Sequence, residues 1–337
     1  MNKNTKKLVI GAGALGFGFS AIAAATYMLT GTLVKVALER NGIDKFKQTP
    51  KTRKIISGMD ENKEFMDLRS AYAEKLSSLP MEEIEIEGYD GTKLVGHFYS
   101  CENAERIIIA MHGWRSSYGE DFGMISDFYH ENNCSVLYAE QRGQGKSGGD
   151  HMGFGLIERF DCLEWVKYIC SKFSLPVYLS GVSMGAATVL MASGFEMPQN
   201  VKGIISDCGF TSPNAIWKHI ANNNMKLAYG VIGKIANDMC KKKIQMGSSD
   251  FSATMALKTT KIPVLFIHGT DDHFVPINMT YENYKACASP KKLLVIPGAD
   301  HAMSFFIDSE QYKKTVLDFW AEFDKYEYTL PEKSDII

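Results

Sequence analysis

Residues 181–185 read G-V-S-M-G, a G-x-S-x-G pattern at the junction between a strand-like segment and a helix-forming segment. An apolar run at 176–182 precedes the serine, and a helix-forming run at 184–195 follows it. The pentapeptide alone also occurs in ordinary loops, so this flanking context matters. A strand, a tight turn and a helix would hold Ser183 up at the carboxyl end of a sheet, with glycines where a side chain would strike neighbouring backbone. We therefore expect Ser183 to be a nucleophile held in a strained turn.

A serine hydroxyl needs a base to accept its proton, and the base needs an acid that fixes its tautomer. After a serine on such a turn, the acid and then the histidine follow along the chain. Two buried-strand patterns, at 261–267 and 292–297, are followed by loops at 268–276 and 298–301. The loop after the second strand contains glycine and carries His301, the predicted base. The weaker alternatives are His112, His268 and His273.

The predicted acid lies in the loop that follows the strand at 261–267, where the sequence reads H-G-T-D-D-H-F-V-P. Asp272 fits the pattern H-G-x-x-D-x-x-V-P without a gap, so Asp272 is the favoured residue. Asp271 is the alternative, and we expect its side chain to bond the backbone of the loop instead.

An acyl-transfer site also needs N–H donors for the oxyanion of the tetrahedral intermediate. One donor is expected from the residue after the nucleophile, Met184. The second is expected from the loop after the strand at 106–111, and Trp114 is the predicted residue. The Trp114 indole either lines the acyl pocket or packs at its rim, and the sequence does not separate these two roles.

With these motifs in place, the chain resembles the α/β-hydrolase superfamily, and within it the serine-aminopeptidase-like and acyl-thioesterase-like hydrolases. The matching motifs occur in the order of the family and span roughly residues 81–326: 111–114, 142–147, 181–185, 268–276 and 298–301. One departure is Glu140, where that branch usually has aspartate two residues before the Arg-Gly turn. We expect this change to affect the loop rather than the chemistry, and Arg142 to shape the same loop.

Composition argues against several other classes of protein. The chain has 337 residues, 45% of them hydrophobic, and a net charge of −2, so it can bury a large core and has no basic surplus for nucleic acid. The zinc patterns C-x-x-C and H-E-x-x-H are absent, and no metal or cofactor is expected. The seven cysteines are odd in number and scattered, which indicates free thiols rather than a disulfide framework.

The N-terminal region is different in character, because residues 8–38 are apolar or small apart from Lys35. About 20 such residues are enough to span a bilayer as a helix, so we expect a retained single-pass anchor. A cleavable signal peptide is the alternative. The pattern G-x-G-x-x-G at 11–16 lacks a preceding strand, so it does not indicate a nucleotide site. The lysines before the apolar run favour an extracytoplasmic catalytic domain, although basic residues after the run favour the opposite orientation.

The remaining sequence divides into a linker and one catalytic domain. We expect a membrane anchor at 1–40, a linker with a helix at 41–80, and a catalytic domain at 81–330. Strand and helix patterns alternate through the domain after an initial hairpin, which predicts an α/β fold: a mostly parallel eight-stranded sheet with helices on both faces. Residues 209–260 interrupt this alternation and are expected to form a helical cap over Ser183.

The predicted function is that of a serine hydrolase. It would cleave a carboxylic ester, thioester or amide through an acyl-enzyme on Ser183, Asp272 and His301. The expected partner is a small-molecule or lipid-like acyl substrate, and a membrane through the N-terminal helix. An acyltransferase with the same triad and a catalytically silent binding protein of this fold are the alternatives. The sequence leaves the physiological substrate and the oligomeric state open.

Overall fold

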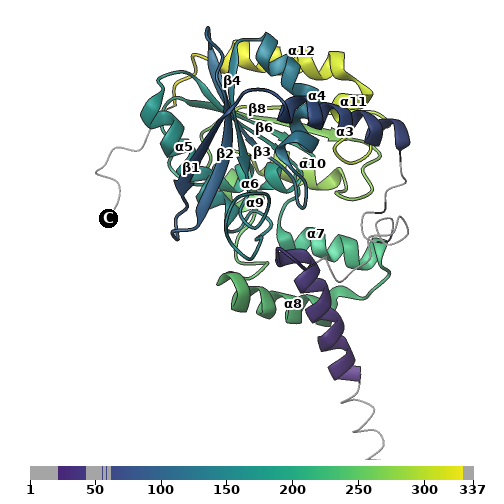
Figure 1. Ribbon diagram of the computed structural model, residues 1–337. Coiled ribbons are helices and arrows are strands. Elements are labelled where there is room, and N and C mark those ends of the chain that lie inside the picture. The colour runs from purple at the N-terminus through teal and green to yellow at the C-terminus, as the bar shows by residue number, and fades with distance from the viewer. Residues whose placement is uncertain (1–21, 43–54, 56–57, 59–61, 329–337) are drawn as a thin grey trace, which may run out of the picture.

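A computed structural model describes residues 22–42, 55, 58 and 62–328 of the protein (Figure 1). Its centre is a single sheet with the strand order β1-β2-β4-β3-β5-β6-β7-β8. Strands β1 and β2 form an antiparallel hairpin, β2 runs antiparallel to β4, and the other six strands are parallel to one another. The strands are β1 (Glu82–Glu87), β2 (Lys93–Tyr99), β3 (Arg106–Met111), β4 (Cys134–Glu140), β5 (Val177–Val182), β6 (Val201–Asp207), β7 (Val264–Gly269) and β8 (Lys291–Ile296). The predicted α/β fold with a mostly parallel eight-stranded sheet is confirmed.

Helices cover both faces of the sheet, because its central strands are apolar on both sides. Along β3, Ile107 and Ile109 belong to one core cluster, whereas Ile108 and Ala110 belong to the other. The first cluster is covered by α5 (Glu158–Lys172), α6 (Met184–Ala192), α9 (Ala253–Leu257) and α10 (Asn278–Ala286). The second is covered by α3 (Lys63–Ser77), α4 (Tyr118–Glu131), α11 (Ser304–Ile307) and α12 (Ser309–Phe323).

Helix α3 comes from the segment that precedes the first strand, and it packs along α4. The two helices approach closely at Gly123, where an added Cβ would lie 2.7 Å from the backbone of Tyr72. Arg69 of α3 also reaches Asp121 of α4, with 2.7 Å between guanidinium and carboxylate. Helix α3 therefore lies against the sheet domain.

The interval between β6 and β7 holds a helical insertion. It consists of α7 (Pro213–His219), a single π-helical turn η1 (Ile220–Asn224), α8 (Tyr229–Ile244) and α9. Helices α7 and α8 stand off one end of the sheet, and α9 returns to pack on α6 (Figure 1). We call α7, η1 and α8 the cap.

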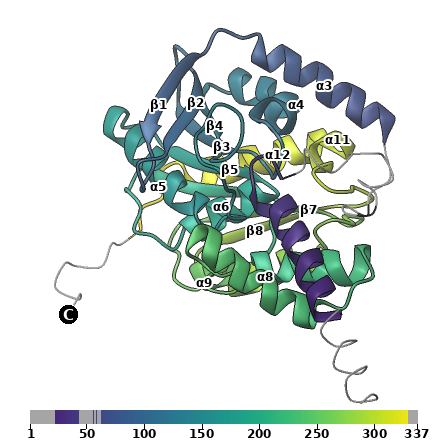
Figure 2. The same cartoon turned by 60° about the horizontal axis from the view of Figure 1, so that its bottom comes forward.

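The N-terminal helix at residues 22–38 lies beside the cap (Figures 1 and 2). One face of its second half is buried, with Val34 at 3% exposure and Leu38 at 0%. Its first half is exposed, as Ile22 and Met28 show. The apolar residues that predicted contact with lipid therefore include several that are covered by the protein itself.

The prediction of a membrane-spanning N-terminal helix is wrong. Within the described part of the chain, no helix combines the length and the apolar content that crossing a bilayer requires. The predicted localisation depended on that anchor and is corrected with it, including the extracytoplasmic position of the catalytic domain. Residues 8–21, where the predicted span began, lie outside the described residues.

Candidate active site

Ser183 occupies a sharp turn between β5 and α6. Its backbone has φ 55° and ψ −114°, a conformation that a residue with a side chain rarely adopts. Glycine is required on either side of this turn for steric reasons. An added Cβ at Gly185 would collide with the carbonyl oxygen of Met111, and one at Gly181 would collide with the backbone of Gly185. The strain places the serine side chain at the carboxyl edge of the sheet, beside the loop that follows β3.

Three side chains from distant parts of the sequence form one hydrogen-bonded row at this edge. The His301 Nε2 atom lies 2.9 Å from the Ser183 hydroxyl, and its Nδ1 atom lies 2.7 Å from Asp272 Oδ2. Because a carboxylate only accepts hydrogen bonds, Nδ1 carries the proton and Nε2 faces the hydroxyl as an acceptor. The three residues follow β5, β8 and β7, and each is less than 10% exposed.

The Asp272 carboxylate is saturated with hydrogen-bond donors. Its Oδ1 accepts the backbone N–H groups of Phe274 and Val275 at 2.9 and 2.7 Å. Its Oδ2 lies 3.1 Å from His268 Nε2 in addition to His301. Burial opposes ionisation of this carboxyl, but the charge of His301 and the hydrogen bonds from both histidines hold the pKa of Asp272 well below its usual range. Asp272 is thus suited to remain an anion behind the imidazole.

His268 is a member of this network that the sequence analysis treated only as a weak candidate for the base. The side chain is fully buried, and Nδ1 lies 2.6 Å from the Thr280 hydroxyl. Its Nε2 faces two acceptors, the Val275 carbonyl at 2.8 Å and Asp272, so Nε2 carries the proton. His268 therefore acts on the site through Asp272. The signal available in the sequence was the spacing of His268 and Asp272 in the pattern H-G-x-x-D.

The environment of His301 favours its protonated form. Burial of the ring favours the neutral form, but the Asp272 carboxylate outweighs burial and raises the pKa of His301 well above its usual value. The Phe274 ring packs edge-on against the imidazole with 5.0 Å between centroids, which fixes its plane. Cys208 also lies close by, and burial raises the pKa of its thiol to about 11, so the thiol is protonated at neutral pH.

A second carboxyl group, Asp207, lies near the triad at the end of β6. Its backbone carbonyl accepts the N–H of Ser183 at 2.9 Å, and its side chain accepts the Ser304 hydroxyl at 3.2 Å. Burial raises the pKa of Asp207 to about 6, against the opposing effect of His268. Sequence reasoning did not identify this residue, because a single aspartate at a strand end has no distinctive spacing.

The two predicted oxyanion residues flank Ser183. Met184 is the first residue of α6, so its N–H has no acceptor within that helix. Trp114 follows Gly113, where an added Cβ would lie 3.4 Å from the Cβ of Ser183. The loop is held in place by Asp121, whose Oδ2 accepts the Gly113 N–H at 2.6 Å. Both predicted donors are thus carried by backbone next to the serine.

The remaining candidates from the sequence lie outside the row. Asp271 is exposed and accepts the Thr270 hydroxyl at 2.7 Å, and the exposed His273 contacts Asp300. His112 is buried, and its Nδ1 donates to the Gly113 carbonyl at 2.9 Å. Arg142 pairs with Asp161 and Asp90 on the far side of its loop, at 2.6 and 2.9 Å. These residues support loops.

Among the described residues, one group offers donor atoms close enough together for a metal ion: Cys208, Asp272 and His301. The atoms lie within 4.8 Å of one another. However, the Asp272 and His301 atoms that face each other already form the hydrogen bond of the row. The donor set is therefore better suited to proton transfer than to metal binding.

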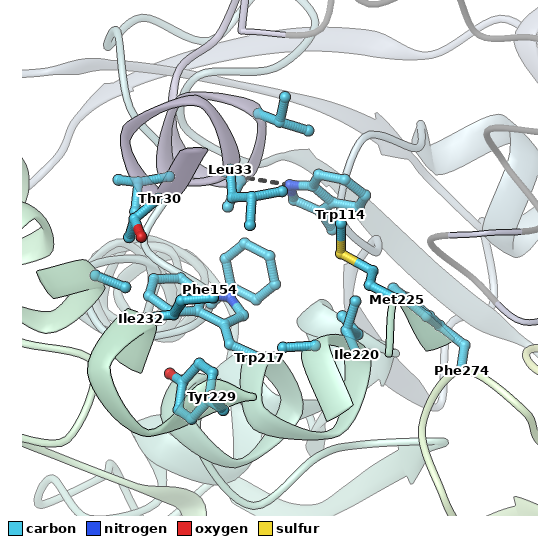
Figure 3. Close-up of a pocket in the computed structure, with 15 residues that line it drawn as sticks. Thr30, Leu33, Trp114, Phe154, Trp217, Ile220, Met225, Tyr229, Ile232 and Phe274 are labelled. Atoms are coloured by element: carbon cyan, nitrogen blue, oxygen red, sulfur yellow. Dashed lines mark hydrogen bonds between the residues drawn. The ribbon is translucent and has the colours of Figure 1, made fainter. Parts of the chain in front are cut away.

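An apolar pocket lies beside the row, between the N-terminal helix and the cap (Figure 3). Trp114 and Phe274 line this pocket and also flank the row, Trp114 through the loop beside Ser183 and Phe274 through its ring on His301. The residues of the described chain that line the pocket include no acidic or basic side chain. We call it the acyl pocket, after the role that is proposed for it below.

Comparisons with known proteins agree with this architecture. The family model described as Serine aminopeptidase, S33 matches residues 102–252, a stretch that includes Ser183 and the whole cap but ends before Asp272 and His301. The uncharacterized protein YqkD of Bacillus subtilis (strain 168) is 26% identical over 234 residues, which cover 69% of this chain and 75% of YqkD. The uncharacterized protein YfhR of Escherichia coli (strain K12) is 26% identical over 71% of this chain and 80% of its own.

A likeness to solved structures extends over the same region. The Pyrococcus furiosus esterase Pf2001 superposes with a TM-score of 0.62 at 20% identity, over 74% of this chain and 94% of the esterase. At that level of identity the likeness concerns the fold alone. The likeness shows that this chain has the α/β-hydrolase fold, and the family match shows that residues 102–252 are similar to the serine-aminopeptidase-like hydrolases.

Proposed function

We propose that the protein is a serine hydrolase that cleaves carboxylic esters or thioesters through an acyl-enzyme on Ser183. The observation that carries this proposal is the continuous row from the Ser183 hydroxyl through His301 to Asp272, with hydrogen bonds of 2.9 and 2.7 Å. A hydrolase role is also supported by the family match and by the fold shared with known esterases.

In the proposed reaction, the Ser183 oxygen attacks the substrate carbonyl carbon while His301 Nε2 takes the hydroxyl proton. The imidazolium is stabilised by Asp272, and the oxyanion is held by the N–H groups of Trp114 and Met184. Each such donor contributes about 2.7–4 kcal/mol of transition-state stabilisation in comparable sites. His301 then protonates the leaving group as the carbon–oxygen or carbon–sulfur bond breaks. Water repeats the sequence and releases the acid.

The chemical character of the acyl pocket favours an ester or thioester over a peptide with a free amino terminus. A substrate ammonium group would need a carboxylate partner in a desolvated site. The described residues that line the pocket supply none. We therefore expect hydrolysis of simple acyl esters to exceed hydrolysis of aminoacyl amides by a wide margin.

The test compares the full chain with Ser183→Ala on p-nitrophenyl acetate and butyrate. We expect kcat to fall about 10⁶-fold, because the loss of a triad nucleophile has an effect of this size in comparable enzymes. Ser171→Ala is the matched control, since Ser171 is exposed on α5 and its hydroxyl donates to the carbonyl of Tyr168 in the same helix. Labelling with a fluorophosphonate, read by intact mass, should add one phosphonyl group to the wild type and to Ser171→Ala only.

Undiminished turnover by Ser183→Ala would contradict the proposal, as would labelling that persists in that variant. An acyltransferase would show a different product pattern. With added alcohols or amines, it would form new esters or amides in preference to the free acid.

A further inference from the structure

The N-terminal helix contributes several of the residues that line the acyl pocket. Thr30, Leu33, Val34, Val36 and Ala37 come from this helix. The opposite wall comes from the cap, with Trp217, Ile232 and Tyr229 among its residues (Figure 3). A segment far from the catalytic motifs in the sequence therefore forms one side of a cavity that shares Trp114 and Phe274 with the surroundings of the triad.

The surface of this pocket is almost entirely apolar, and most polar side-chain atoms of its lining residues are bonded within the protein. The Thr30 hydroxyl donates to its own helix at Thr26, and the Tyr229 hydroxyl donates to Asn214, at 2.7 and 3.0 Å. The Trp114 indole donates to the Ala37 carbonyl at 2.9 Å. Among side-chain polar atoms of the lining residues, only the Trp217 indole N–H lacks an acceptor within the described chain, and that ring meets Phe154 edge-to-face. The pocket thus offers a hydrocarbon surface to its occupant.

We infer that the substrate's acyl chain occupies this pocket and that the N-terminal helix is a specificity-determining wall of it. This inference rests on the proposed function, because an acyl group on the Ser183 oxygen would extend between Trp114 and Phe274, the two residues shared by the pocket and the site. The ligand class is an ester or thioester of a short, unbranched aliphatic acid.

The size of the pocket limits the length of that chain. Its volume is about 90 Å³, whereas a dry cavity of about 150 Å³ in another protein accommodates benzene. By that comparison, the pocket holds about four carbon atoms. A butyryl group fills it, and longer acyl groups must displace one of the walls.

The N-terminal helix, which forms this wall, is bound to the catalytic domain by several hydrogen bonds. Arg115, the residue after Trp114, donates to the carbonyls of Val36 and Glu39 at 2.8 and 2.6 Å. These are carbonyls at the end of the helix, which a guanidinium satisfies well. The backbone N–H of Met152 also donates to the Leu38 carbonyl at 2.7 Å. A change in a pocket-facing side chain of the helix therefore alters the pocket instead of displacing the helix.

The experiment measures kcat/KM of the full chain for p-nitrophenyl acetate, butyrate, hexanoate and octanoate. Two buried methylene groups contribute about 0.8 kcal/mol each, so we expect butyrate to exceed acetate about tenfold and the longer esters to decline. Ala37→Leu fills the pocket from the helix and should lower the butyrate-to-acetate ratio about tenfold. Leu33→Ala enlarges it and should move the optimum to hexanoate.

Ala25→Leu is the matched control, because it makes the same change on the exposed part of the same helix. Its chain-length profile should match that of the wild type. If the wild type cleaves acetate but shows no chain-length preference, or if Ala37→Leu leaves the ratio unchanged, the inference is overturned and the proposed function stands. If the wild type cleaves none of the esters, both fail.

Discussion

The triad and the acyl pocket lie side by side, but they are built from different kinds of segment. The triad residues follow three parallel strands, so the sheet itself brings Ser183, Asp272 and His301 to a common edge. The pocket is enclosed by the N-terminal helix and the cap, neither of which belongs to the sheet. In the described chain, these two walls meet through side-chain packing and an ion pair between Lys243 of α8 and Glu39 at the end of the N-terminal helix.

This difference separates two kinds of constraint. At the triad, each polar atom has a particular partner, and a shift of one ångström would break a hydrogen bond. In the pocket, the walls need only be apolar and of suitable volume, and many side chains satisfy that requirement. We therefore expect substitutions at the triad to change the rate by orders of magnitude, and substitutions in the pocket to redistribute the rate among substrates.

After the loss expected for Ser183→Ala, the largest effect is expected at Asp272, on the triad side of this comparison. Asp272→Asn should lower kcat about 10⁴-fold, because an amide no longer holds His301 in the tautomer that accepts the serine proton. Asp271→Asn is the natural control, since Asp271 is adjacent in sequence but exposed and outside the row. Steady-state kinetics on p-nitrophenyl butyrate measure both. Similar losses in the two variants would mean that the row does not carry the chemistry.

The next effect concerns the pH dependence of kcat/KM. The reaction needs neutral His301, and Asp272 raises the pKa of His301. Activity should therefore fall tenfold per pH unit below a midpoint that lies above the ordinary value of about 6.5. His268→Ala removes one donor from the Asp272 carboxylate. The carboxylate then stabilises the imidazolium more strongly, so the midpoint should move higher still.

The pH profile is best recorded with p-nitrophenyl butyrate at the isosbestic wavelength of the phenol. His268→Gln retains an N–H donor at the same reach and should restore the wild-type midpoint. A merely structural role for His268 would lower activity in both variants without moving the midpoint. A wild-type midpoint below 6.5 would contradict the assigned environment of His301.

The smallest expected effect concerns the pocket, and it tests how firmly the N-terminal helix is attached to the loop beside Ser183. Arg115 is a positioning residue that joins the loop beside Ser183 to the N-terminal helix through several carbonyls. Lysine offers a single compact ammonium in place of the planar guanidinium, so Arg115→Lys should loosen the wall. We expect the butyrate-to-acetate ratio of kcat/KM to fall about threefold. Lys35→Arg, on an exposed position of the same helix, should leave the ratio unchanged.

A large fraction of the sheet domain could be predicted because its signals are local. Strands were expected where β3, β5, β7 and β8 occur, and the alternation of strands and helices indicated a parallel sheet. The residues of the triad were each singled out by a position directly after a strand. Their roles stay a prediction until the variants are measured, but their proximity follows from strand order alone.

The N-terminal helix shows where local signals mislead. Hydropathy describes how much a segment avoids water, and it does not say whether lipid or protein covers it. Residues 22–38 read as part of a membrane span, yet Val34, Val36 and Leu38 are buried against the rest of the chain. Only the tertiary structure could reveal that partner, because the cap and the loop that cover them are more than 70 residues away.

By itself, the sequence determined the sheet, the strained turn at Ser183 and the strand ends that carry His301 and Asp272, because all of these depend on short-range patterns and on the geometry of parallel strands. The tertiary structure alone decided the contact of His268 with Asp272, the shape of the acyl pocket and the place of the N-terminal helix in its wall. Those features arise from packing between segments with no periodic or spacing signal in common, and packing depends on shape in three dimensions.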